Sequence, residues 1–472
     1  MSLKIMGLGL DYEGKLLFEA TDEIEFATTL VNSMERNVEN IRKEDHTRST
    51  ANVFRGEIER AIIDLADPKS AGWAYLINAN DPQRDEIESI IKPLAVHRGM
   101  EDPSKPLLFN NESPDEWFDW LNDNYFALEL DTGKIPKYIL IVGSPDQVPF
   151  RFQSILDSVA NVGRGDFDDL DDLETYVKKL IRIETASELF LDKEALIFGP
   201  DGGLPDPTYF SRLYMARPMT EHIRNKFHLT ANLIEGDAAT KNNLLNNLKG
   251  KRPALVYTAS HGLGATSQSF DFQKRYNGAI CCQHQGPLTL DHLFTADDIP
   301  MNEPFLEGSA FFQFACFGYG TPAESDYTHW IKGTPETYTE KDFVAALPKK
   351  LLAHPNGPII FIGHLDTAFL HGFVDVESPH ILDRWHKRIA PFVDAINQLL
   401  GVLPCGLAMQ EMNDRYTVCN AIITNTYDRH RRGRLEWNDD LRSRFLNSWI
   451  IRSDAQNYMV FGDPAAHLRM PE

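Results

Sequence analysis

Cysteine is scarce in this chain, with five residues among 472. Proteins that depend on a disulfide framework are short and far richer in cysteine, so the sequence predicts no such framework. Cys281, Cys282 and His284 lie close together, but adjacent cysteines do not fit the gap of about two to four residues between structural zinc ligands. We therefore interpret that stretch as a strand or loop, and we expect no metal and no other cofactor. The cysteines are Cys281, Cys282, Cys316, Cys405 and Cys419.

Long apolar runs are also absent. No run reaches the roughly 18 residues that a membrane-spanning helix needs. At the amino terminus, Asp11 and Glu13 interrupt the apolar stretch too early for the core of a signal peptide. The sequence therefore predicts no membrane contact and a cytoplasmic location.

Basic residues are outnumbered, since 47 Lys and Arg stand against 69 Asp and Glu, for a formal net charge of -22. A surface with this charge repels the phosphates of a nucleic acid unless its basic residues cluster strongly. Five basic side chains lie close together in residues 424–440, including RHRRGR at 429–434, but we interpret this stretch as a solvated loop and not as a binding surface. Nucleic acid is therefore not an expected partner.

Short apolar runs rich in β-branched and aromatic residues recur along the chain, and their length and composition favour buried strands. Helical patterns lie between them, as in residues 169–181, where Leu170, Leu173, Val177 and Leu180 share one face. Strands that alternate with helices predict an α/β fold with mainly parallel sheets covered by helices. The apolar runs are residues 73–78, 138–143, 195–199, 254–260, 310–316 and 358–364.

The length of the chain exceeds what one compact core holds, so we expect two adjacent α/β units. We place the amino-terminal unit at residues 1–184 and the second unit at residues 185–472. The acidic helical segment 169–181 should lie near their junction. After the run that ends at Cys316, the stretch 317–356 is rich in Gly, Pro, Thr and charge, and we expect it to be the least regular.

Two of the predicted strands end in residues that can react together. His261 and Gly262 follow the run 254–260, and Cys316 closes the run 310–316, 55 residues after the histidine. In open parallel sheets, sites form just beyond the carboxyl ends of the strands. A thiol becomes a strong nucleophile once it is deprotonated, and an imidazole can take that proton. The backbone N–H groups of Gly262 and Cys316 would then stabilise an oxyanion.

These residues carry a resemblance to a known family. YTASHG (257–262) and FFQFACFGYGTP (311–322) are similar to the His-Gly and Ala-Cys motifs of caspase-fold (clan CD) cysteine peptidases. The chain most resembles the gingipain family and the bacterial caspase-like domains called CHAT, over roughly residues 135–470. Further segments similar to those of the family follow in its order, at residues 138–150, 161–167, 356–369 and 457–468.

The resemblance implies a caspase-like three-layer sandwich and a regulated intracellular cysteine endopeptidase that works through an acyl-enzyme. Cys316 would be the nucleophile, and His261 the base or the acid that protonates the leaving amine. Gly262 and Cys316 would supply the oxyanion donors. The family's third catalytic member is an acidic residue upstream of the histidine, and no motif in this sequence identifies it. A protein or peptide is the expected substrate, and an activating protein or protease is a candidate partner.

The specificity pocket leaves two alternatives open. In arginine-specific gingipains, an Asp upstream of the catalytic His binds the basic side chain of the substrate. The matching stretch here, residues 207–217, offers Arg212 and Arg217 instead. Asp366 and Phe369 lie where the resemblance places the pocket wall. Asp366 would receive a basic side chain or would only cap the turn after the strand, whereas Arg212 would receive an acidic one.

Two other functions compete with the peptidase. A caspase-type fold can serve as a binding or scaffold protein without turnover, but both reactive residues and the glycines that follow them are present here. A serine hydrolase that uses Ser260 would need a G-x-S-x-G turn, which the sequence lacks at that position. If the chain is a latent peptidase, cleavage or ordering of the stretches 317–356 or 424–440 is the predicted switch.

Overall fold

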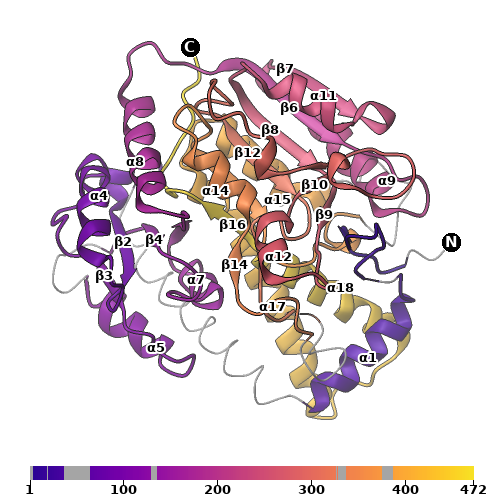
Figure 1. Cartoon of the computed structure of the whole chain (residues 1–472). Helices are drawn as coiled ribbons and strands as arrows, with labels where there is room; N and C mark the ends of the chain where they lie inside the picture. The colour runs from indigo at the N-terminus through magenta and orange to yellow at the C-terminus, as the bar shows by residue number, and fades with distance from the viewer. Residues whose placement is uncertain are drawn as a thin grey trace.

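The computed structural model describes residues 4–18, 20–36, 64–128, 135–325, 327, 336–374 and 386–471. Its centre is a ten-stranded sheet with helices on both faces (Figure 1). The strands of this sheet are β2 (Trp73–Asn78), β3 (Leu107–Phe109), β4 (Tyr138–Val142), β5 (Asn161–Gly165), β6 (Asp192–Gly199), β7 (Thr230–Glu235), β8 (Pro253–Ala259), β12 (Ala310–Phe314), β15 (Ile360–His364) and β16 (Tyr458–Phe461).

The strand order in this sheet is β3-β2-β4-β5-β16-β15-β12-β8-β6-β7. Every neighbouring pair is parallel except β15 with β16. The predicted α/β fold with a mainly parallel sheet is therefore confirmed. Each of the apolar runs found in the sequence coincides with a strand, namely β2, β4, β6, β8, β12 and β15.

The α-helices with more than one turn of described backbone are α1 (Glu23–Arg36), α4 (Arg84–His97), α7 (Phe150–Leu156), α8 (Leu170–Thr185), α9 (Pro207–Ser211), α10 (Arg217–Phe227), α11 (Lys241–Leu248), α12 (Phe270–Tyr276), α14 (Ala346–Ala353), α15 (His386–Leu400), α17 (Gln410–Arg431) and α18 (Asp439–Gln456). Shorter helical turns are α3 (Pro68–Ala71), α5 (Trp117–Trp120) and α16 (Cys405–Ala408). Among the described helices, none combines the length and the apolar character that crossing a bilayer requires.

The strands of the two predicted units share one sheet. On one side lie β3, β2, β4 and β5, and the pair β5–β16 joins them to the remaining strands. The acidic helix α8 begins after Asp169, whose side chain accepts a hydrogen bond from the Asp172 amide at 2.8 Å. It packs against α4 of the first predicted unit and α14 of the second. The boundary near residue 184 stays a prediction.

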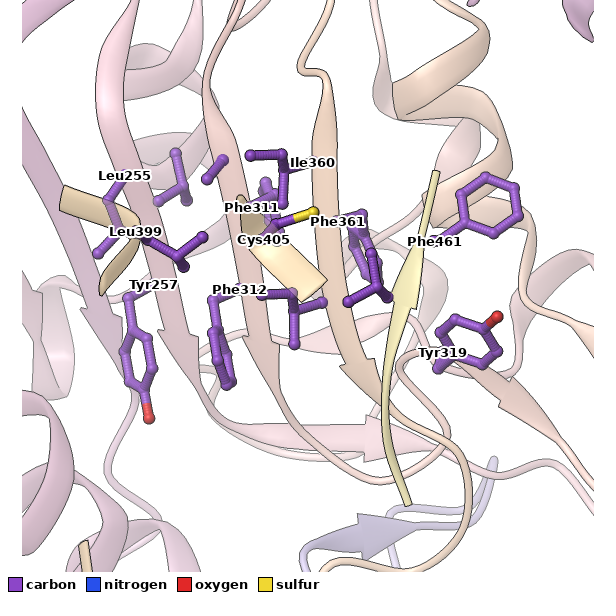
Figure 2. Close-up of a cluster of buried hydrophobic side chains, with 14 of the residues drawn as sticks. Leu255, Tyr257, Phe311, Phe312, Tyr319, Ile360, Phe361, Leu399, Cys405 and Phe461 are labelled. Atoms are coloured by element: carbon purple, nitrogen blue, oxygen red, sulfur yellow. The ribbon is translucent and has the colours of Figure 1, made fainter. Parts of the chain in front are cut away.

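Aromatic side chains pack on both faces of the main sheet at β12 and β15. Phe312 and Phe314 of β12 contact the ring of Phe392 on α15, while Phe311 points to the opposite face and stacks on Phe361 of β15 at 5.6 Å. Figure 2 shows Phe311 and Phe312 of β12 beside Ile360 and Phe361 of β15. Dense packing holds the ends of these strands in fixed positions.

A buried ion-pair cluster ties the first unit to the end of the chain. The Arg98 guanidinium donates to both Glu184 oxygens at 2.7 and 2.8 Å and to Asp463 at 2.6 Å. Asp463 also accepts from the indole of Trp73 on β2 at 2.9 Å. Burial acts to raise the pKa of Glu184, but the charge of Arg98 and the hydrogen bonds from His97 and Arg98 outweigh it and lower this pKa to about 2. Asp463 lies in the Gly-Asp-Pro segment that resembles the family's closing motif. Directly after β16, this segment is therefore held by hydrogen bonds to Trp73 of β2 and to Arg98.

We expect Arg98→Met to lower the free energy of unfolding by about 3–5 kcal/mol, because it leaves two buried carboxylates without their cation. Since the folded-state pKa of Glu184 is depressed, its contribution is present above its ordinary pKa and is lost as the pH falls from about 4.5 towards 2. Urea unfolding at pH 7 and pH 4 measures both effects. The control is Arg84→Met, which breaks a more exposed pair with Glu88 and should cost no more than about 0.5 kcal/mol. Equal losses for the two variants would contradict this account.

The prediction that residues 424–440 form a loop is wrong for most of this stretch. Helix α17 runs to Arg431 and α18 begins at Asp439, so only the turn between them is irregular. The basic residues occupy the last turn of α17, where positive charge complements the helix dipole, and Arg432 pairs with Asp428. The basic stretch is thus largely helical, because α17 and α18 pack along each other.

The stretch 317–356 is more regular than its composition indicates. Strand β13 (Gly320–Thr321) pairs antiparallel with β14 (Phe343–Val344), and α14 follows directly. Residues 326 and 328–335 of this stretch lie outside the described residues. The short strands escaped prediction because two-residue pairings leave no periodic pattern in a sequence.

A second, smaller sheet lies beside the carboxyl end of β8. Its strands are β1 (Gly9–Leu10), β9 (His261–Leu263), β10 (Ile280–Cys281) and β11 (Leu293–Phe294), in that order. Cys281 thus lies in a strand, and among the described residues no three His, Cys, Asp or Glu side chains gather as a metal site would require. This sheet brings the amino-terminal residues next to His261.

Candidate active site

The two residues predicted to react lie at the ends of neighbouring strands. Strands β8 and β12 are adjacent and parallel, with Ala259 opposite Phe314, and His261 and Cys316 lie just beyond those positions. The backbones there are in close contact, because a Cβ atom added at Gly262 would lie 1.9 Å from the carbonyl oxygen of Cys316. Glycine is therefore required next to His261 by the approach of the Cys316 segment.

His261 is paired with a carboxylate that the sequence analysis did not identify. Both oxygens of Asp206 lie 3.0 Å from His261 Nε2. Asp206 also caps α9, since its Oδ1 accepts from the Thr208 amide at 2.8 Å. Burial acts to raise the pKa of Asp206, but the interactions with His261 and the hydrogen bonds from Thr208 outweigh it and lower this pKa to about 2. Asp206 is therefore an ionised acceptor at neutral pH.

This pairing selects which imidazole nitrogen can act as a base. An ionised carboxylate accepts a hydrogen bond, so it favours the tautomer that carries its proton on Nε2. The other nitrogen, Nδ1, is buried and has no hydrogen-bond partner among the residues that the structure describes. In a neutral ring of this tautomer, Nδ1 holds the free lone pair. The arrangement matches the base and orienting carboxylate of triad hydrolases.

A local signal for Asp206 was present in the sequence. Asp followed by Pro marks the N-cap and the first residue of a helix, and Asp206 lies one residue before the stretch 207–217 in which the resemblance places a substrate-binding carboxylate. Pairing with His261 was still not predictable, because the two residues are 55 positions apart and meet only when β8 and α9 pack.

The thiol of Cys316 is fully buried. Burial raises its pKa well above the ordinary value, and the charges of Asp366 and Asp454 add to that shift. The backbone amides of Ala368 and Leu8 oppose it, and the Ala368 N–H donates to Sγ at 3.1 Å. The thiol is thus neutral in this conformation, and it needs a more polar environment or a proton acceptor to become a nucleophile.

The predicted oxyanion donor on Gly262 has a partner. Its N–H donates to the carbonyl oxygen of Leu8 at 3.0 Å. A backbone carbonyl thus occupies the position predicted for the oxygen of a substrate, and the role of this N–H as an oxyanion donor stays a prediction. The role of the Cys316 amide as the second donor stays a prediction.

The residues predicted for specificity lie on two sides of Cys316. The Arg212 guanidinium pairs with Asp201 at 2.8 Å and Glu235 at 3.1 Å, which leaves it poorly suited to clamp a substrate. Asp366 is buried, and its Oδ1 accepts from the Thr367 amide at 2.6 Å. This hydrogen bond is compatible with both predictions for Asp366, a carboxylate that binds a basic substrate side chain and a residue that only caps the turn.

Two further candidates have their partners within the fold. The ring of Phe369 is buried and contacts those of Phe18 and Tyr327 at 5.0 and 4.7 Å. The Ser260 hydroxyl donates to the carbonyl of His261 at 3.0 Å. The hydroxyl of Ser260 is thus held by a backbone carbonyl. The place of Phe369 as a wall of the pocket stays a prediction.

A cavity of about 270 Å³ lies elsewhere, beyond the carboxyl ends of β4 and β5. Its lining includes Gly143, Asp166 and Asp169 and none of the residues predicted for catalysis or specificity. It is therefore separate from the candidate active site.

Comparison with known proteins gives matches in fold only. No protein-family model matches the chain, and no curated protein matches its sequence. The crystal structure of the Arg-specific cysteine proteinase gingipain R is 12% identical, with a TM-score of 0.44, and the match covers 84% of this chain and 78% of that one. A structure described as a protease has a TM-score of 0.49 at 8% identity and covers 84% and 78%. The Saccharomyces cerevisiae separase–securin complex has a TM-score of 0.30 at 10% identity and covers 70% and 16%.

Proposed function

We propose that this chain is a cysteine endopeptidase in which Cys316 attacks the peptide bond and His261 moves the protons. The observation that carries the proposal is the pairing of the partly exposed Asp206 with the buried His261, at the strand end next to that of Cys316. Of the functions considered, only nucleophilic catalysis requires an imidazole oriented by an ionised carboxylate next to a thiol.

The proposed reaction uses each of these groups in turn. The thiol proton passes to Nδ1 of His261 as Sγ attacks the carbonyl carbon of the substrate, and Asp206 stabilises the imidazolium that forms. The N–H of Gly262 donates to the oxyanion. His261 then protonates the leaving amine as the C–N bond breaks, which leaves a thioester on Cys316. Water, deprotonated by His261, hydrolyses the thioester and restores the thiol.

A scaffold protein without turnover is the alternative. It would need neither a reactive thiol nor an oriented imidazole, and it would gain nothing from an ionised Asp206 held against the buried His261. The pair therefore favours the enzyme.

Incubation of the purified chain with a diverse peptide library tests the proposal. We expect slow cleavage at defined bonds, detected by mass spectrometry over hours, and loss of that cleavage once a thiol-alkylating reagent has modified Cys316. Peptide mapping of the alkylated chain shows which cysteines reacted. Cleavage that persists with Cys316 fully alkylated would reject the peptidase function.

A further inference from the structure

Residues 5–10, near the amino terminus, run between two segments that flank Cys316, with a bend at Leu8 and the strand β1 at Gly9–Leu10. On one side, Gly262 and Gly264 donate to the carbonyls of Leu8 and Leu10 at 3.0 and 2.8 Å. On the other side, the Leu8 amide donates to Ala368 at 2.8 Å, and Leu370 donates to Met6 at 2.9 Å. Figure 1 shows this stretch as the dark blue trace beside β9. The segment therefore fills a slot whose two walls both belong to the candidate active site.

The backbone around the Leu8–Gly9 bond lies against the thiol. A Cβ atom at Gly9 would lie 3.3 Å from both Sγ and Cβ of Cys316, and the Leu8 amide is close enough to lower the pKa of that thiol. Leu8 and Cys316 are both fully buried. The Leu8–Gly9 peptide bond and the Cys316 thiol are therefore both shielded from solvent.

The backbone contacts of this segment fall on two groups that are predicted to bind a substrate. The carbonyl of Leu8 accepts from Gly262, the predicted oxyanion donor. Gly7, the preceding residue, forms an antiparallel bridge with Phe369, on the predicted pocket wall. Extended peptides commonly bind proteins by adding a strand to an exposed sheet edge, with alternate side chains in pockets. In this register, Leu8 is the residue before the scissile bond and Gly9 the residue after it.

Small residues flank Leu8 for steric reasons. A Cβ at Gly7 would come within 2.6 Å of Thr367, and a Cβ at Gly9 would come within 2.9 Å of Leu17. The Leu8 side chain belongs to the main cluster of buried hydrophobic residues. The slot thus holds a small residue, a large apolar residue and another small residue in sequence.

On the premise of the proposed peptidase function, we infer that residues 6–9 occupy the substrate channel as a resident peptide, with the Leu8–Gly9 bond presented to Cys316. The site then takes substrates with a large apolar side chain before the cut and small residues on either side of it. A second peptide binds only when this segment leaves, so the intact chain is held in check by its own amino-terminal segment.

Cleavage of the resident bond follows the chemistry of the site. Attack of Sγ on the Leu8 carbonyl carbon forms a thioester, the bond to the Gly9 nitrogen breaks, and His261 gives that nitrogen a proton. Water then releases residues 1–8 with a carboxylate on Leu8. Until water attacks the thioester, the new amine of Gly9 stays close to it, because the Leu17 amide donates to the Gly9 carbonyl at 3.0 Å. Religation by a neighbouring amine therefore competes with hydrolysis, and the resident bond turns over slowly.

The test separates the segment from the chain without deleting it. The recognition sequence of a site-specific protease is inserted after Glu13, in the exposed turn that the Asp11 and Lys15 backbones close. The control places the same sequence at Gly433, in the exposed turn between α17 and α18. Both proteins are cut and diluted into a large excess of the fluorogenic peptide acetyl-Ile-Met-Gly-Leu-aminomethylcoumarin. Hydrolysis of this peptide and alkylation of Cys316 by iodoacetamide are then followed.

We expect the cut after Glu13 to raise both rates at least about tenfold, the control cut to change neither, and added peptide of residues 4–13 to reverse the gain. Hydrolysis that depends on Cys316 but is equally fast before and after cutting overturns the inference alone. A preference for Arg or Asp over Leu before the scissile bond also overturns the inference. The inference fails as well if residues 5–10 stay bound to the cut protein in the presence of excess peptide. Faster alkylation without any hydrolysis rejects the peptidase function, and with it the substrate assignment.

Discussion

Replacement of Cys316 by alanine should abolish peptide hydrolysis, lowering kcat/KM by at least about a thousandfold, because the thioester can no longer form. The loss of one buried sulfur atom should cost about 1 kcal/mol of stability, which leaves the chain folded. Hydrolysis of a peptide identified from the library gives kcat/KM, and circular dichroism during thermal unfolding reports the fold.

Cys405→Ala is the matched control for this substitution. Cys405 is also a fully buried free thiol, and its Sγ lies 3.3 Å from the carbonyl oxygen of Asp463, away from His261. We expect its replacement to change kcat/KM by no more than about twofold at a similar cost in stability. Similar activity in the two variants would show that Cys316 is not the nucleophile.

Replacement of Asp206 by asparagine should lower kcat/KM by about 10²–10⁴-fold, because the neutral amide neither stabilises the imidazolium nor fixes the ring with its proton on Nε2. Asparagine is as good an N-cap as aspartate, so α9 and the fold should persist. Kinetics at several pH values adds a second readout. The depressed pKa of about 2 keeps Asp206 ionised above pH 4, so any loss of wild-type activity between pH 4 and 8 must come from another group.

Asp201→Asn is the control for this variant. Asp201 lies in the same loop, pairs with Arg212 at 2.8 Å and accepts from the Gly203 amide at 2.8 Å. Its loss removes a carboxylate of similar location without touching His261, and we expect less than about a threefold change in kcat/KM. If the two variants lose activity equally, the carboxylate acts through the loop and does not orient the histidine.

The burial of Cys316 changes where control of the proposed activity is expected. The stretches 317–356 and 424–440 are the switches predicted from the sequence, and their part in activation stays a prediction. The segment at residues 5–10 lies nearer to the chemistry, because it supplies the carbonyl on Gly262 and covers the thiol. Its removal would hydrate the thiol and weaken the burial that raises its pKa.

Local pattern was enough to locate six of the ten strands of the main sheet and to single out His261 and Cys316 as candidates. Runs such as 254–260 and 310–316 are apolar throughout because strands buried on both faces have no polar side, and this composition is visible within a few residues. Because parallel strands end at one edge of the sheet, His261 and Cys316 were expected together before the strand order was known. Strands β5 and β7 were missed because NVGRG and TANLIE interrupt the apolar pattern with glycine and polar residues.

Tertiary structure alone decided the partners of these residues. The sequence contains Asp206 and residues 5–10, but nothing in their local pattern indicates that one meets His261 and the other lies between Gly262 and Phe369. Such contacts join segments tens to hundreds of positions apart, and they depend on how β8, β12 and β15 align and on which loop packs over their ends. Residue type and periodicity encode how a segment folds and which face it buries, whereas the neighbour across a buried contact is fixed only by the packing of the whole chain.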